Sequence, residues 1–209
     1  IGEGMKMKIT IAAILTGVLL MNLLSFPVVT KFTEKTEYIY NPMMGFAPSA
    51  DYDSIVGDHT LVYVDLTWRD WEPKQGVYNT ALFEEENNLE LWKSLGKKVV
   101  FRFICDLPDK REQTMDIPDW LYDEIGEDGT WYDISYGKGF APNYGNKTFI
   151  SRHAETIQAI GDRYGKDNFF CFVQLGSIGH WGEWHVNYDT GIQRLPAGAK
   201  LEQYITPYV

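Results

Sequence analysis

The fold is decided by the stretch KKVVFRFICD (97–106), an apolar run that ends in a carboxylate. Its β-branched and aromatic residues are typical of a strand that is buried on both faces. Two other runs have the same character, TLVYVDLTW (60–68) before it and FFCFVQLG (169–176) after it. The runs show little of the alternation expected of a half-solvated antiparallel sheet, so they predict a parallel sheet.

Helical patterns separate these predicted strands. Residues 79–96 carry leucines and a tryptophan at helical spacing and stop at Gly96, a residue that favours helix ends. Residues 147–165 form a second amphipathic pattern, again closed by glycine. Between strand and helix lies a long polar stretch, 107–146, which contains a predicted short helix at 116–125.

Strands that alternate with helices indicate an α/β fold with helices covering a parallel sheet. We expect the first strand at NPMMGFAP (41–48), a short apolar piece bounded by prolines. A doubly wound sheet and a TIM (β/α)8 barrel both fit this order. No G-x-G-x-x-G fingerprint follows the run 60–68, which weakens the dinucleotide-binding form.

The amino-terminal part has the pattern of a targeting segment. MKMK (5–8) precedes ITIAAILTGVLLMNLLSF (9–26), an uncharged apolar run. We interpret residues 1–26 as a signal peptide or an N-terminal membrane anchor, residues 27–40 as a linker and residues 41–209 as the folded domain. The chain is therefore expected to be exported, to the cell surface or the extracellular space, with membrane association through the first segment if it is not cleaved.

The composition of the chain limits the kinds of molecule that it is expected to bind. The net charge is −10 at pH 7, and no cluster of lysine and arginine lies along the domain, so we expect no nucleic-acid partner. Aromatic residues reach 15%, with 7 Trp and 13 Tyr, which fits either a large packed core or rings that bind sugars. Cys105 and Cys171 lie inside apolar runs and are expected to be free buried thiols, with a disulfide as the alternative.

Polar and aromatic residues gather directly after the predicted strands. TWRDWEP follows the first of the three runs, CDLPDK the second and GHWGEWH the third, whereas the loops before the strands are short and plain. In parallel α/β folds the binding site lies at the carboxyl ends of the strands. The sequence therefore predicts a site at that end of the sheet.

The stretch WRDWEPKQGVY (68–78) resembles the W-x-x-x-E-P-x-x-G-x-Y/F piece of clan A glycoside hydrolases, especially the β-galactosidase and xylanase branches. NPMMGF (41–46) and GSIGHWGEWH (176–185) are similar to bacterial secreted glycosidase-like domains of unknown function. The resemblance covers about residues 41 to 188.

This resemblance implies a (β/α)8 barrel that hydrolyses glycosides with retention, using two carboxylates. It places Glu183 in the acid/base region after the fourth strand. The chain would then be the N-terminal half, a TIM barrel truncated after about four strands at Val209, with the nucleophile outside it. Such a half barrel is expected to be inactive.

Glu183 is the candidate catalytic residue, since Trp181 and Trp184 on either side of it could favour its protonated form; a structural role is the alternative. Arg102 lies in the middle of a strand and needs a carboxylate partner, either Asp65 or Glu183. Glu72 is interpreted as structural. The candidate substrate-binding residues are Trp68, Arg102, Asp106, His180, Trp181, Trp184 and His185.

The first hypothesis is thus an exported retaining glycoside hydrolase whose substrate is a glycoside or an oligo- or polysaccharide. A non-catalytic sugar-binding or cell-surface protein is the second. The third is a metal-dependent hydrolase that would use His180, Glu183 and His185, although this H-x-x-E-x-H spacing does not match a known zinc motif. We expect no cofactor and no metal.

Overall fold

The computed structural model describes residues 30–34, 36, 43–54 and 58–209. The chain divides into two units between Tyr40 and Asn41, and every strand and helix of the described residues belongs to the second unit. The predicted signal peptide or anchor (1–26) and most of the predicted linker lie outside the described residues. No helix within the described ranges is long and apolar enough to cross a membrane.

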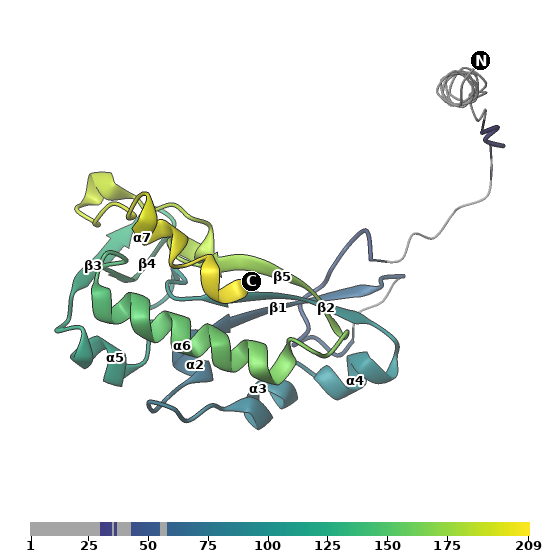
Figure 1. The fold of residues 1–209 in the computed structure, drawn as a ribbon, viewed down its shortest axis with the longest axis horizontal. Coiled ribbons are helices and arrows are strands. Elements are labelled where there is room, and N and C mark those ends of the chain that lie inside the picture. Colours follow the sequence, from purple (N-terminus) through teal and green to yellow (C-terminus); the bar gives the residue numbers. More distant parts are fainter. Residues whose placement is uncertain (1–29, 35, 37–42, 55–57) are drawn as a thin grey trace, which may run out of the picture. The chain divides into compact units, whose positions relative to one another are not determined.

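Three parallel strands form the main sheet, in the spatial order β1-β2-β5. Their bounds are Leu61–Thr67 for β1, Lys98–Ile104 for β2 and Phe170–Ser177 for β5. Each of the three predicted runs is therefore a strand, and both pairings are parallel as expected. The carboxyl ends of the three strands consequently lie at one edge of the domain (Figure 1).

The prediction of a truncated (β/α)8 barrel is wrong. Within the described residues the parallel sheet is open and has three strands, and a separate sheet has two antiparallel strands. The expected first strand at 41–48 contributes no strand from its described part; next to it, only an isolated bridge joins Ser49 to Tyr63. Pro48 has no backbone N–H to donate to a hydrogen-bond ladder, which limits the pairing of this segment with β1. At the other edge, β5 pairs with β2 alone.

Helices cover one face of the parallel sheet, where α6 runs along the strands (Figure 1). The described residues form six α-helices, α2 (Trp68–Trp71), α3 (Thr80–Glu86), α4 (Leu89–Ser94), α5 (Asp119–Glu124), α6 (Lys147–Tyr164) and α7 (Ala199–Glu202). Three short 3-10 helices are η1 (His180–Gly182), η2 (Tyr188–Thr190) and η3 (Thr206–Tyr208). The helices predicted at 116–125 and 147–165 correspond to α5 and α6.

The helix predicted at 79–96 is interrupted. Asn88 has a left-handed backbone (φ 51°), which separates α3 from α4, and its side-chain amide donates to the carbonyls of Ala50 and Asp51. Asparagine tolerates this conformation better than most residues do. Gly96, with φ 68°, follows the end of α4 as predicted.

An antiparallel hairpin, β3 (Gly129–Ile134) and β4 (Gly137–Pro142), lies in the stretch predicted to be polar loop and short helix. A two-residue turn, Ser135–Tyr136, joins the strands, since Ile134 pairs with Gly137. This turn lacks the Asn-Gly or Asp-Gly sequence that signals a hairpin most strongly. The hairpin matters because it brings two tyrosines, Tyr132 and Tyr136, against His180 in the segment that follows β5.

The core lies between the sheet and the helices. Its strand residues are Val62, Val64, Leu66, Val99, Phe101 and Phe103, all buried. Trp68 and Trp71 of α2 are completely buried among them, and Glu72 beside them is only 3% exposed. The opposite face of the sheet has no such cover, and Tyr63, Asp65, Arg102 and Gln174 lie there with partial or full exposure.

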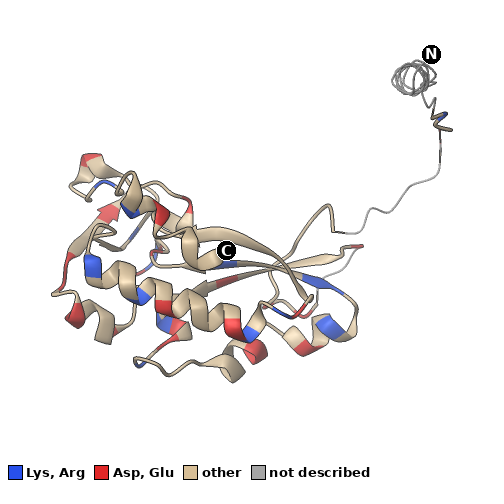
Figure 2. Ribbon diagram, viewed as in Figure 1, with Lys and Arg blue, Asp and Glu red and all other residues tan. Residues whose placement is uncertain are grey.

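Both cysteines are free, Cys105 in the core and Cys171 partly buried on β5. The predicted free thiols are therefore present, but only Cys105 is fully buried. Acidic and basic side chains are interspersed along the described ribbon, without a continuous basic stripe over it (Figure 2).

Candidate functional site

The segment 176–185, which contains the end of β5 and the loop after it, has an unusual backbone. Ser177 (φ 73°), Trp181 (φ 55°) and Trp184 (φ 59°) all adopt the left-handed region, which costs energy for residues with a β-carbon. Strained residues of this kind cluster at functional sites, where the surrounding structure holds them. The loop is therefore a candidate centre for a site at the carboxyl end of the sheet.

Backbone hydrogen bonds hold this loop in place. The Trp181 N–H donates to the Asp106 carbonyl at 2.8 Å, and the His180 N–H donates to the His185 carbonyl at 2.9 Å. Gly179 is required for this closure, because a β-carbon there would lie 2.5 Å from the His185 carbonyl oxygen. The ends of β2 and β5 are thus joined by a tight, defined loop.

Asp106 and His180 form a completely buried pair behind the loop. The His180 Nδ1 and the Asp106 Oδ2 are 2.8 Å apart, and the Tyr132 hydroxyl donates to Oδ1 at 2.5 Å. The Asn187 N–H donates to Nε2 of His180, so Nδ1 carries the ring hydrogen and donates to Asp106. Burial raises the pKa of Asp106, and its bonds from His180 and Tyr132 oppose the rise.

The predicted substrate-binding roles of Asp106 and His180 do not fit this arrangement. Neither side chain has any exposed surface, and both ring nitrogens of His180 are engaged. The pair instead fixes the position of the loop that carries Glu183.

Glu183 lies in front of this pair, and its side chain is 50% exposed. Its carboxylate is 3.5 Å from the Arg102 guanidinium and 3.6 Å from Nε2 of His185. Arg102 also donates to the Gln174 side-chain oxygen at 2.6 Å and to the Trp181 carbonyl at 3.0 Å. Of the two carboxylate partners predicted for Arg102, Asp65 and Glu183, it is Glu183 that forms an ion pair with it.

A second carboxylate, Asp65, lies beside the same arginine. Asp65 is paired with Arg102 in the β1–β2 register, so both side chains emerge on the open face of the sheet. Partial burial raises the pKa of Asp65 and the charge of Glu183 adds to the rise, while Arg102 opposes it. Asp65 and Glu183 are therefore both close enough to Arg102 to form one group of charges with it.

Aromatic rings lie on the same loop as Glu183 and on the hairpin turn beside that loop. The rings of Trp181 and His185 are 6.0 Å apart, and Tyr136, from the hairpin turn, lies 5.2 Å from Trp181. Trp184 and His185 line a pocket of about 340 Å³, together with Val186, Tyr188, Arg194 and Leu195. Three predicted substrate-binding residues, Trp181, Trp184 and His185, are therefore partly or fully exposed and close to Glu183.

The structure does not place Trp68 at this site. Its ring is completely buried on the helix side of the sheet, and its indole N–H donates to Glu72 at 2.9 Å. A residue without exposed surface cannot stack on a sugar, so the prediction that Trp68 binds substrate is wrong for this structure. The first helical turn of α2 turns the side chain back under the strand.

Buried His153 supports the strained Ser177 from α6. Its Nε2 lies 2.7 Å from the Ser177 hydroxyl, which also lies 2.7 Å from the Tyr208 hydroxyl of η3. Burial lowers the pKa of His153 to about 3. The neutral imidazole of His153 therefore holds Ser177 in place, where β5 ends and the loop begins.

This lowered pKa predicts acid sensitivity. The unfolded chain takes up a proton on His153 below about pH 6.5, whereas the folded chain does not, so stability is lost as the pH falls from 6.5 towards 3. We expect His153 to contribute a loss of about 3 kcal/mol between pH 6.5 and pH 4. Urea denaturation across this range should show a smaller loss for His153→Gln, which does not titrate.

Asp116, whose pKa is raised by burial to about 7, changes stability in the opposite sense over the same range. The comparison of His153→Gln with the unaltered chain isolates the histidine, because Asp116 is common to both. The exposed His185→Gln serves as the matched control. Equal pH slopes for the unaltered chain and His153→Gln would contradict the assignment.

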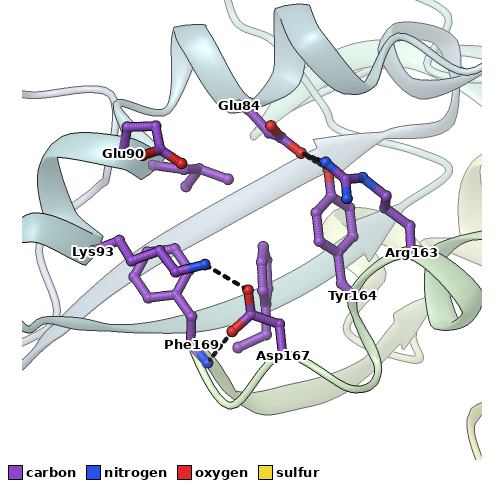
Figure 3. Close-up of a pocket in the computed structure, with 9 residues that line it drawn as sticks. Glu84, Glu90, Lys93, Arg163, Tyr164, Asp167 and Phe169 are labelled. Atoms are coloured by element: carbon purple, nitrogen blue, oxygen red, sulfur yellow. Dashed lines mark hydrogen bonds and ion pairs between the residues drawn. The ribbon is translucent and has the colours of Figure 1, made fainter.

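A smaller pocket lies at the other end of the sheet, between α3, α4, the end of α6 and the start of β5 (Figure 3). Its volume is about 100 Å³, below the 300 Å³ or more of typical ligand sites. Its charges pair with each other, Arg163 with Glu84 at 2.6 Å and Lys93 with Asp167 at 2.8 Å. This pocket is therefore a structural ion-pair cluster.

The sequence indicated Asp65 only as a possible partner of Arg102, and it gave no indication of Gln174 or of the hairpin tyrosines Tyr132 and Tyr136. The mid-strand position of Arg102 already indicated a polar neighbour on β1, but Gln174 and the tyrosines had no comparable signal. In the part of the chain that the structure describes, no three histidine, cysteine, aspartate or glutamate side chains converge as metal ligands. No known protein-family model matches the chain, and a search of curated proteins found no significant match.

Proposed function

We propose that this chain is an exported carbohydrate-active enzyme that hydrolyses glycosidic bonds, with Glu183 at the centre of its active site. The observation that carries the proposal is the setting of Glu183. It is a half-exposed carboxylate on a strained loop, 3.5 Å from Arg102 and 3.6 Å from His185, and the next residues of the loop, Trp184 and His185, line a 340 Å³ pocket. Export rests on the apolar run 9–26.

The two carboxylates fit different roles. Glu183 is half exposed and lies 3.5 Å from the Arg102 guanidinium, so its carboxylate is accessible to a substrate as a nucleophile must be. The raised pKa of Asp65 suits a proton donor to the leaving oxygen. Retaining glycosidases use one carboxyl group as the acid and a second as the nucleophile. We therefore assign the nucleophile to Glu183 and the acid to Asp65, which reverses the role that the resemblance implies for Glu183.

The rings supply the binding surface. Apolar faces of sugar rings stack on tryptophan and tyrosine, and Trp181, Trp184 and Tyr136 offer partly exposed rings on the loop of Glu183 and the adjacent hairpin turn. The amides and charges of Gln174, Arg102 and His185 can bond to sugar hydroxyls.

Sugar binding without hydrolysis is the second candidate. It is favoured by the two partners of Glu183, Arg102 and His185, whose side chains lie 3.5 and 3.6 Å from its carboxylate and leave it less free to react. A metal-dependent hydrolase is disfavoured because His180 is buried and uses both ring nitrogens within the protein.

The test is turnover of a panel of aryl glycosides, measured by release of the phenol, with tryptophan fluorescence as an independent report of binding. The proposal predicts turnover of at least one glycoside that chelator does not abolish. Saturable binding without turnover would favour the second candidate, and absence of both binding and turnover across the panel would contradict the proposal. Turnover that chelator abolishes would favour the metal-dependent alternative.

A further inference from the structure

The pocket next to Glu183 contains an arginine, Arg194, that the chemistry of the two carboxylates does not use. The volume of this pocket is about 340 Å³, within the range of about 300–1,000 Å³ that is typical of small-molecule sites. Its apolar lining consists of Trp184, Val186, Tyr188 and Leu195, and its polar lining consists of His185 and Arg194. An apolar pocket with few polar groups takes its specificity from those groups.

Arg194 differs from the other arginines of the chain because it has no carboxylate partner. The others all form ion pairs, namely Arg69, Arg102, Arg111, Arg152 and Arg163. Arg194 forms none with any described residue, although the net charge of the chain is −10 and carboxylates are abundant. Its guanidinium is therefore available to bind an anion that comes from outside the protein.

Tyr188 orients this guanidinium. The Cζ atom of Arg194 lies over the Tyr188 ring, 3.5 Å from the ring centroid. Stacking of this kind covers one face of the guanidinium and leaves the N–H donors around its edge free. No acceptor among the described residues takes these donors. The free edge matches a carboxylate, which a guanidinium can bind through two parallel hydrogen bonds.

The segment that carries Tyr188 and Arg194 is anchored to the buried part of the site. The Asn187 N–H, directly before Tyr188, donates to Nε2 of the buried His180 at 3.2 Å. Ile192, two residues before Arg194, is only 3% exposed. The backbone that presents the arginine is therefore in place before a ligand binds, which lowers the entropic cost of binding.

We propose that this pocket binds an acidic sugar, a hexuronic acid whose C6 carboxylate is held by Arg194, and that the substrates of the site are therefore uronides. This inference rests on the proposed function, because it names the substrate class of the same site. Hydrolysis of such a substrate adds water across the glycosidic bond and releases the uronic acid and an alcohol.

The other pocket residues suit a sugar in this position. The Trp184 indole N–H donates to the Leu175 carbonyl at 2.6 Å, which fixes the ring on which a sugar face can stack. His185 lines the pocket and also lies 3.6 Å from Glu183, so the pocket reaches the carboxylate that is assigned to the reaction.

An acidic sugar explains Arg194 better than a neutral one does. A hydrogen bond between two charged groups is roughly twice as strong as one between neutral groups, and a hydroxyl cannot match both prongs of the guanidinium edge. A protein with a net charge of −10 repels anions from most of its surface, so a cation inside the pocket is needed to receive one.

The test compares acidic and neutral substrates that differ only at C6. The p-nitrophenyl glucuronides and galacturonides of both anomers are assayed on the full chain against the matching glucosides and galactosides. We expect kcat/KM to be at least tenfold higher for an acidic substrate than for its neutral counterpart. Arg194→Gln should lower this ratio about tenfold or more, and Arg194→Lys should restore only part of it, because lysine keeps the charge without the planar fork.

Arg111→Gln is the matched control, because it removes the same charge from an exposed arginine outside the pocket and should keep the ratio of the unaltered chain. Circular dichroism identifies variants that remain folded. Equal kcat/KM for acidic and neutral substrates, or an unchanged ratio in folded Arg194→Gln, would overturn the inference while leaving glycoside hydrolysis in place.

Calorimetry separates the inference from the proposed function. The probes are the methyl glycosides of glucuronic acid, galacturonic acid, glucose and glucose 6-sulfate. Tighter binding of a uronide than of the glucoside, lost in Arg194→Gln, would support the acidic-sugar pocket even if no glycoside is hydrolysed. Absence of binding by both uronides, or binding of the 6-sulfate as tight as that of the better uronide, would overturn the assignment of a carboxylate to Arg194.

Discussion

Replacement of Glu183 by glutamine is expected to lower kcat/KM for aryl glycoside hydrolysis by about 10³-fold or more, with little change in stability. The amide keeps the size of the side chain but cannot attack an anomeric carbon or accept a proton. Because the Glu183 side chain is 50% exposed and its ion pairs are at 3.5 and 3.6 Å, the fold depends on it only weakly. Steady-state kinetics and thermal denaturation measure the two effects separately.

Glu86→Gln is the matched control, because Glu86 is exposed on α3, on the helix-covered side of the sheet. Retention of turnover in Glu183→Gln would remove the residue from the mechanism. A loss of binding equal to the loss of turnover would instead indicate a binding role, since removal of the nucleophile should affect kcat more than KM.

The assignment of the acid can be tested with Asp65→Asn. A variant that lacks the proton donor should lose activity by about 10²-fold on glycosides with poor leaving groups. It should retain activity on dinitrophenyl glycosides, whose leaving group departs without a proton. Equal losses on both substrates would contradict the role of Asp65 as the acid.

Most individual strands and helices could be predicted from the sequence, because each is encoded by the residues within it. The runs that became β1, β2 and β5 are apolar and β-branched, and α6 has a capping asparagine, Asn146, whose side chain accepts from two backbone N–H groups. The number and closure of strands were not predictable, because they depend on pairing between distant segments. Residues 41–48 looked like a strand by composition, yet next to them only one bridge forms with β1.

In the site, too, local features could be predicted and contacts between distant segments could not. The position of polar residues after the strands, together with the need of Arg102 for a carboxylate, predicted the Arg102–Glu183 pair. Spacing alone could not tell which side of a strand end a ring would take, so Trp68 was placed in the site although it lies in the core. Asp106 and His180 were likewise expected to contact substrate. They are buried because the hairpin covers them with Tyr132, and the sequence did not predict this hairpin.

Glu72 shows how a buried carboxylate can hold this core together. Its side chain accepts from the Trp68 indole at 2.9 Å, the Thr156 hydroxyl at 2.6 Å and the Gly76 N–H at 2.7 Å. These donors come from α2, α6 and the turn that follows α2, so one side chain connects three segments. The structural role expected of Glu72 agrees with these contacts.

Glu72→Ala is therefore expected to destabilise the protein by about 4 kcal/mol. The change leaves the buried donors of Trp68 and Thr156 without an acceptor and opens a cavity between α2 and α6. Urea denaturation followed by tryptophan fluorescence measures the loss, and Glu85→Ala on the exposed surface of α3 is the control.

The double variant Glu72→Ala with Thr156→Val distinguishes unsatisfied donors from simple loss of volume. If the unpaired hydroxyl contributes to the cost, valine at position 156 should recover about 1 kcal/mol in the alanine background. In the unaltered background the same valine should destabilise, because it removes a hydrogen bond to a charged group. A loss below about 1 kcal/mol in Glu72→Ala would show that the carboxylate does not connect these segments.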